Sequence, residues 1–150
     1  LWQSVPNAQS EFVLGIDREW GDFSLIIQYI GKQVSDFEVL EKPTTTGLAE
    51  YVYQVALWNR MIFSQLEERT DSIFLRSSWS LLHETLKLEF LAVANLTTEE
   101  TLFTPKLTYN LADDFTVIFG AQFFNGPDET LYGKIKKGRT AVFSELKASF

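Results

Sequence analysis

The chain of 150 residues is long enough for one domain with a substantial core. Its 13 basic and 20 acidic residues give a net charge of -7, which argues against nucleic acid as a partner because no cationic surface is left to neutralise phosphates. The absence of cysteine excludes disulfides, and the absence of any run of about 18 apolar residues leaves a closed β-barrel as the only way for this sequence to cross a bilayer.

The first elements of the chain are two predicted strands, residues 11–20 and 23–32. In the first strand Phe12, Leu14 and Ile16 alternate with polar positions, and the second strand repeats this period of two. The connection between them reads WGD, which is short and contains glycine. Such a connection favours a hairpin.

Residues 35–70 do not sort into two faces. Within them, residues 48–66 contain neither glycine nor proline, and their apolar positions keep the spacing of a helix. We interpret this stretch as a helix in a long external loop that caps or enters the lumen of a barrel. A pair of additional strands is the alternative.

The second half of the chain predicts five further strands, residues 72–81, 85–95, 102–110, 115–124 and 141–150. Each alternates apolar and polar residues over roughly the 9 to 11 residues that a tilted membrane strand needs. Short connections, LLHE and LADD, alternate with longer ones, NLTTEE and NGPDETLYGKIKKG. Short turns at one end and long loops at the other are typical of outer-membrane barrels. The only histidine, His83, falls in a predicted turn, so we expect no catalytic site and no cofactor.

The strands carry their charged and amide residues on one face and their apolar residues on the other. The predicted lumen-lining residues, which would set ion or solute selectivity or form a self-compensating charge network, are Asp17, Gln28, Lys32, Arg76, Lys87, Glu89, Lys106, Gln122, Glu145 and Lys147. In a water-soluble barrel of lipocalin type the two faces would exchange roles, and Leu14, Ile16, Leu88, Phe90, Val117 and Phe119 would surround an apolar ligand. Alternation alone does not choose between the two.

Aromatic residues on the apolar face gather near the short connections and the C-terminus. If these ends lie together, they form an aromatic girdle at a water-lipid boundary. Its members are Trp20, Phe23, Trp79, Tyr109, Phe115 and Phe150. The girdle favours the membrane interpretation.

The ending VFSELKASF, preceded by PKLTYNLADDFTVIFGAQFFNGP, resembles the C-terminal part of bacterial outer-membrane porin-like proteins. The resemblance covers roughly residues 10 to 34 and 71 to 150. It implies a location in the bacterial outer membrane, contact with lipid and lipopolysaccharide, and passage of small solutes or a structural role in the envelope. It also implies that the last strand, through Val142, Leu146, Ala148 and Phe150, is the signal read by the barrel-assembly machinery.

The sequence therefore predicts an all-β chain, an antiparallel up-and-down transmembrane β-barrel of seven or eight strands. Residues 1–150 would form a single barrel domain or the C-terminal portion of one, with residues 35–70 as an external loop insertion. Seven strands are counted, whereas single-chain bacterial barrels have even numbers. Because the sequence also starts at Leu1 without an initiator methionine, we expect it to be part of a larger barrel, which would assemble as a homo-oligomer or within a larger envelope complex.

Overall fold

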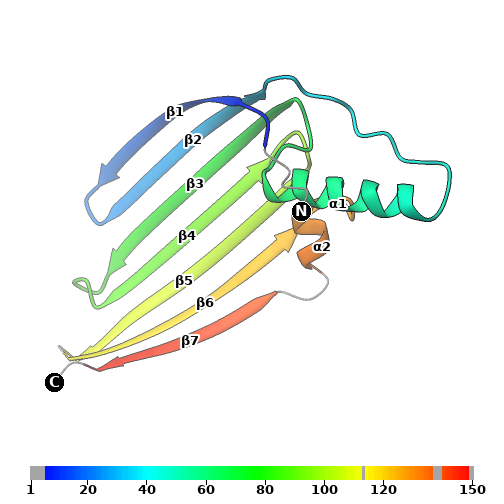
Figure 1. Ribbon diagram of the computed structural model, residues 1–150. Helices are drawn as coiled ribbons and strands as arrows, with labels where there is room; N and C mark the ends of the chain where they lie inside the picture. The colour runs from blue at the N-terminus through cyan, green and yellow to red at the C-terminus, as the bar shows by residue number, and fades with distance from the viewer. Residues whose placement is uncertain (1–5, 113, 137–139, 149–150) are drawn as a thin grey trace.

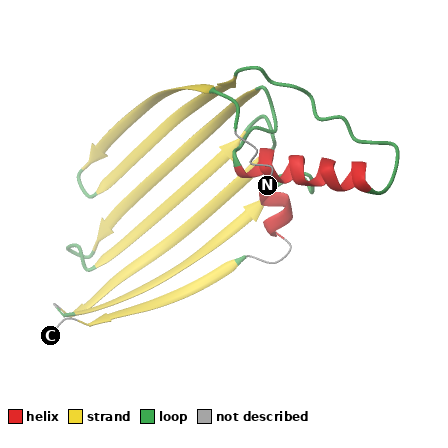
Figure 2. Cartoon of the chain, viewed as in Figure 1, coloured by secondary structure: helices red, strands yellow, loops and turns green. Residues whose placement is uncertain are grey.

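The structure is a computed structural model that describes residues 6–112, 114–136 and 140–148. In this part of the chain, seven strands form one antiparallel sheet in which every strand pairs with the next along the sequence (Figures 1 and 2). The strands are β1 Gln9–Trp20, β2 Phe23–Val34, β3 Arg69–Leu81, β4 Leu86–Asn95, β5 Glu100–Ala112, β6 Phe115–Asn125 and β7 Ala141–Ala148. The prediction of an all-β antiparallel chain with seven strands is confirmed.

Connections of different length join the strands, and two of them contain a helix. At one end of the sheet β1 and β2 are joined through Gly21, whose φ of 57° lies in the left-handed region that glycine adopts without strain. The β3–β4 and β5–β6 connections lie at this same end, which we call the short-turn end (Figure 1). The opposite end, called here the long-loop end, carries residues 35–68 and 126–136.

The predicted closed barrel is wrong for the described residues, which form an open sheet. Among them, β1 pairs only with β2 and β7 pairs only with β6. In an antiparallel meander the first and seventh strands run in the same direction, so their direct pairing would be parallel. An all-antiparallel closure therefore needs an odd number of further strands.

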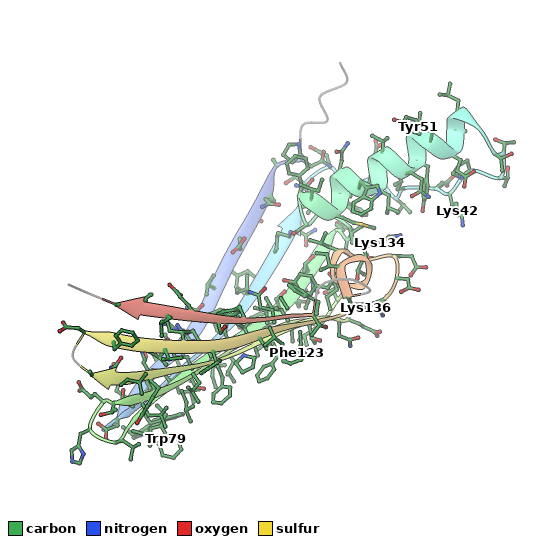
Figure 3. All side chains as sticks on the ribbon, turned by 90° about the horizontal axis from the view of Figure 1, so that it is seen from below. Lys42, Tyr51, Trp79, Phe123, Lys134 and Lys136 are labelled. Carbon is green, nitrogen blue, oxygen red and sulfur yellow. The ribbon has the colours of Figure 1, made fainter. Side chains whose placement is uncertain are left out.

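The sheet is curved, and its two faces are distinct. Figure 3 shows the β1 and β7 edges bending toward the side that carries the helices, with Trp79 and Phe123 on the opposite side. Side chains of the polar set, such as Lys32 and Asn95, line a cavity together with Met61 of the first helix. The polar face is therefore concave and the apolar face convex.

Two helices lie at the long-loop end. The first, α1 Leu48–Ile62, is the predicted helix, so the alternative of two extra strands is wrong. The second, α2 Leu131–Lys136, was not predicted because six residues are too few for a helical period to emerge. Its one local signal is Thr130, whose hydroxyl accepts a hydrogen bond from the Gly133 amide at 3.3 Å, as an N-cap does. Neither helix is long and apolar enough to span a membrane.

Candidate functional site

The convex face of the sheet exposes large apolar side chains. Leu14 is 67% exposed, Ile16 is 66% exposed and Phe119 is 53% exposed. The charged residues of this face within the described strands are Arg18, Arg69 and Asp71, and all of them lie near a strand end. An exposed apolar surface that continues across a whole sheet marks a face meant to meet lipid or another apolar surface.

A row of aromatic rings borders this face at the short-turn end. Trp20 stacks on Phe23 with ring centroids 6.0 Å apart, and Phe23 meets the edge of Trp79 at 6.4 Å. The short-turn row consists of these three residues with Tyr109 and Phe115, which occupy the same face on β5 and β6. Five of the six predicted girdle residues thus share one face and one end. The sixth, Phe150, lies outside the described residues.

A second row of aromatic rings, not predicted from the sequence, borders the same face toward the long-loop end. Phe12 lies 5.8 Å from Tyr29, and Phe103 stacks on Phe123 at 6.3 Å. These four residues, the long-loop row, stand six or eight residues from the short-turn row along their own strands. Alternation within the strands places each of these rings on the apolar face, but none of them lies next to a short connection.

The two aromatic rows are separated by somewhat less than the apolar band of an outer-membrane barrel. Six to eight residues of strand span about 20 to 26 Å at roughly 3.3 Å per residue. At the tilt of about 35 to 45° that outer-membrane strands have, this would be roughly 14 to 21 Å along a membrane normal, which is shorter than the apolar band of about 25 Å in outer-membrane barrels. Beyond the long-loop row, the Asp71 carboxylate accepts a hydrogen bond from the Tyr29 hydroxyl at 2.5 Å. It also forms an ion pair with Arg69 at 3.2 Å. Polar groups therefore resume where the aromatic row ends.

Four of the predicted lumen-lining residues come together on the concave face. The Glu89 carboxylate lies 2.6 Å from the Lys106 ammonium and 3.6 Å from both Arg76 and Lys87. The strand register explains the contacts, because Glu89 is directly opposite Lys106 and diagonal to Arg76. We call these four residues the Glu89 cluster.

The other predicted lumen-lining residues share the concave face but not the cluster. Glu145 and Lys147 form a separate ion pair at 3.7 Å on β7. Lys32 donates a hydrogen bond to the carbonyl of Ser64, in the loop after α1. Of the remaining three, Asp17 forms no ion pair in the described part of the chain, and Gln28 and Gln122 are uncharged amides. The structure thus divides the predicted set into one hub and several separate positions.

Two strand glycines are covered by aromatic rings from the neighbouring strand. A Cβ at Gly31 would collide with the ring of Phe12 on the convex face, and one at Gly120 would collide with Phe143 on the concave face. Each ring lies directly across from its glycine in the register. This packing fixes the register of both outer hairpins.

The helices cover the long-loop end of the concave face. Glu100 at the start of β5 is buried, and its carboxylate accepts hydrogen bonds from the Tyr132 amide and the Thr98 hydroxyl, both at 2.7 Å. The Tyr132 ring contacts Phe124 of β6 edge-on at 5.4 Å. A cavity of about 240 Å³ remains between Met61, Tyr132 and the sheet. The concave face is therefore partly closed at this end and open along the rest of its length.

The predicted assembly signal lies on β7, an edge strand. Val142 and Leu146 are on the convex face and are 79% and 62% exposed, and Ala148 follows on the same face. Phe150 again lies outside the described residues. The described part of the signal is an apolar stripe next to an unpaired strand edge.

Comparisons of this chain with protein-family models, with curated proteins and with solved structures found no match. The functional assignment therefore rests on the sequence and the structure themselves.

Proposed function

We propose that this chain forms part of the wall of a β-barrel in the bacterial outer membrane, with a porin-like role in the passage of small polar solutes. The convex face would contact lipid and, at the long-loop end, lipopolysaccharide. The concave face would line a wet lumen. A structural role in the envelope would use the same two faces.

The observation that carries the proposal is the exposed apolar band between two aromatic rows. Aromatic rings are enriched where a membrane protein crosses the water-lipid interface, and a membrane strand needs one row at each interface. Exposure of the apolar side chains of Leu14, Ile16 and Phe119 on the convex face is unfavourable in water and favourable in contact with lipid. The ion-paired residues of the opposite face suit a hydrated interior.

The lipocalin alternative lacks this support. A lipocalin needs its apolar residues on the concave face, around the ligand. By strand register, Phe90 and Phe119, which would line that interior, share the face of Trp79 and Phe123. Figure 3 shows Trp79 and Phe123 on the convex side. We therefore propose no apolar-ligand carrier.

The β7 edge suits recognition by the barrel-assembly machinery. An unpaired strand edge can accept a further strand through its free amide and carbonyl groups. The apolar stripe of Val142, Leu146 and Ala148 would face lipid while this edge is bound. The described part of β7 therefore offers both the pairing groups and the membrane-facing surface that such recognition would use.

Two measurements test the proposal. First, the protein is mixed with phospholipid vesicles and floated on a density gradient, with heat-modifiable migration in gels as a check of the folded barrel. Second, single-channel conductance is recorded in planar bilayers from the complete barrel to which this chain belongs, because the described residues form an open sheet that needs further strands to close. We expect flotation, heat modifiability and discrete conductance steps. A protein that stays in the dense fraction and remains monomeric without detergent would contradict the membrane assignment. Flotation without conductance would leave only the structural role.

A further inference from the structure

The Glu89 cluster holds more positive than negative charge. Arg76, Lys87 and Lys106 come from three adjacent strands and surround one carboxylate. Three cations against one anion leave two positive charges uncompensated within the cluster. Like charges held this close repel one another, so binding of a further anion would stabilise the cluster electrostatically.

The contacts within the cluster leave donors unused. Only Lys106 approaches Glu89 at hydrogen-bond distance, 2.6 Å. Arg76 and Lys87 stand 3.6 Å from the carboxylate, beyond the length of a good hydrogen bond. A guanidinium has five N–H donors and an ammonium has three. Both side chains can therefore donate to a second acceptor without giving up their present contacts.

The exposure of the four side chains shows where that acceptor would sit. The Glu89 side chain is only 14% exposed, whereas Arg76, Lys87 and Lys106 are 53%, 43% and 38% exposed. The Glu89 carboxylate is thus the more buried group, and the three cationic side chains extend beyond it to the surface of the concave face. Hydroxyl residues occupy neighbouring register positions: Ser80 and Thr108 are directly opposite Lys87, and Ser78, whose hydroxyl bonds that of Ser24 at 2.7 Å, is directly opposite Glu89. Hydroxyls add neutral donors for oxyanions.

Negative charge on the same face lies elsewhere. The acidic residues of β1 on this face, Glu11, Asp17 and Glu19, are separated from β3 by β2. Glu100 is on β5, six residues from Lys106, and its carboxylate already accepts hydrogen bonds from Thr98 and Tyr132. Glu145 is on β7, where Lys147 already pairs with it. Apart from Glu89, no acidic side chain of the described strands forms an ion pair with the three cations.

We propose that Arg76, Lys87 and Lys106 form a binding site for a small free oxyanion, a phosphate or a carboxylate, on the concave face. The inference rests on the proposed function in that this face is the path of the solute. Guanidinium and ammonium groups together suit oxyanions, the first through its planar fork and the second as a point charge. Glu89 positions the cations and competes with the ligand.

The test measures binding of inorganic phosphate to the full chain in detergent, by isothermal titration at low salt. Arg76→Gln and Lys87→Gln should each weaken binding about fivefold, because a charge at about 4 Å in a water-like dielectric contributes about 1 kcal/mol. Lys147→Gln is the matched control, with the same charge change on the same face, and should change affinity less than twofold. Glu89→Gln removes the competing anion and should tighten binding about fivefold.

Several results would overturn the site. These are no binding at millimolar phosphate, equal weakening in Lys147→Gln, or a Glu89→Gln protein that binds no tighter than the parent. Arg76→Lys keeps the charge, and its retained binding would show that loss in Arg76→Gln is not misfolding. A parallel titration with short-chain phosphatidic acid covers a lipid headgroup as the source of the phosphate. Binding of this lipid alone, without inorganic phosphate, would also contradict a site for free anions.

The outcome is separable from that of the membrane assignment. Vesicle flotation is run on the same preparation. Phosphate binding by a protein that does not float would refute the membrane location and keep the anion site. Flotation of a protein that binds no phosphate would refute the anion site and keep the membrane location.

Discussion

Placing an arginine at the middle of the convex face should destabilise the protein in a bilayer by an amount that depends on depth. Phe119 is the best position, because it lies on β6 four residues from Phe115 and four residues from Phe123. Four residues of strand cover about 13 Å, or roughly 10 Å along the membrane normal after tilt. Phe119 is therefore near the centre of the apolar band.

The size of the effect follows from this depth. An arginine on the lipid face costs about 2 to 4 kcal/mol at the midplane and about 0 to 1 kcal/mol near an interface. Since replacing phenylalanine also removes a ring, each arginine variant is compared with the alanine variant at the same site. The difference between Phe119→Arg and Phe119→Ala should be about 2 to 4 kcal/mol. The same difference at Phe115 should be no more than about 1 kcal/mol.

The assay is reversible folding into phospholipid vesicles, followed by tryptophan fluorescence during denaturant titration. A difference at Phe119 no larger than that at Phe115 would refute the reasoning. In water, a residue already 53% exposed should tolerate arginine within about 0.5 kcal/mol. The costs of arginine at position 119 expected in a bilayer and in water therefore differ by more than the error of the measurement.

Three further predictions concern local packing. Gly120→Ala should destabilise the sheet by about 1 kcal/mol because its Cβ displaces the Phe143 ring, and a double-mutant cycle with Phe143→Ala should show that the cost disappears when the ring is absent. Glu100→Ala should speed amide exchange in α2 more than tenfold, since a hydrogen bond to a charged group is worth about 1.5 to 3 kcal/mol; unchanged exchange would contradict the anchoring role. Burial, and then the charge of Glu100, raise the pKa of Tyr132 above its ordinary value of 10.0, so docking of α2 should be complete below pH 10 and weaken as pH rises through the raised pKa. Tyr132→Phe should abolish this dependence in exchange measurements, and a dependence that persists would refute its assignment to Tyr132.

The strands could be predicted because their signal is local. In β6 the apolar residues Val117, Phe119 and Ala121 alternate with a set that includes Thr116 and Gln122, and this period of two predicts both the element and its faces. The helix α1 could be predicted for the same reason, since its 15 residues are enough to show a different period. The strand boundaries differ from the predicted ones by at most three residues, and α1 ends at Ile62, four residues before the predicted end at 66.

Features that depend on pairing between distant residues could not be predicted. The central place of Glu89 requires the register that sets it opposite Lys106 and diagonal to Arg76, and alternation within one strand does not contain that register. The open sheet likewise depends on whether the edges of β1 and β7 find partners. The long-loop aromatic row is predictable from the sequence, because alternation already places Phe12 and Phe123 in the apolar set.

The most direct test of the membrane wall compares two neighbouring serines of β3. Ser77 and Ser78 are the same residue type, yet they point to the convex and the concave face. The chain has no cysteine, so Ser77→Cys and Ser78→Cys can each carry a single spin label without background. In vesicles we predict that the label at 77 collides mainly with oxygen dissolved in lipid, and that the label at 78 collides mainly with a water-soluble nickel chelate. Equal access of both labels to the chelate, or the reverse preference, would contradict the account.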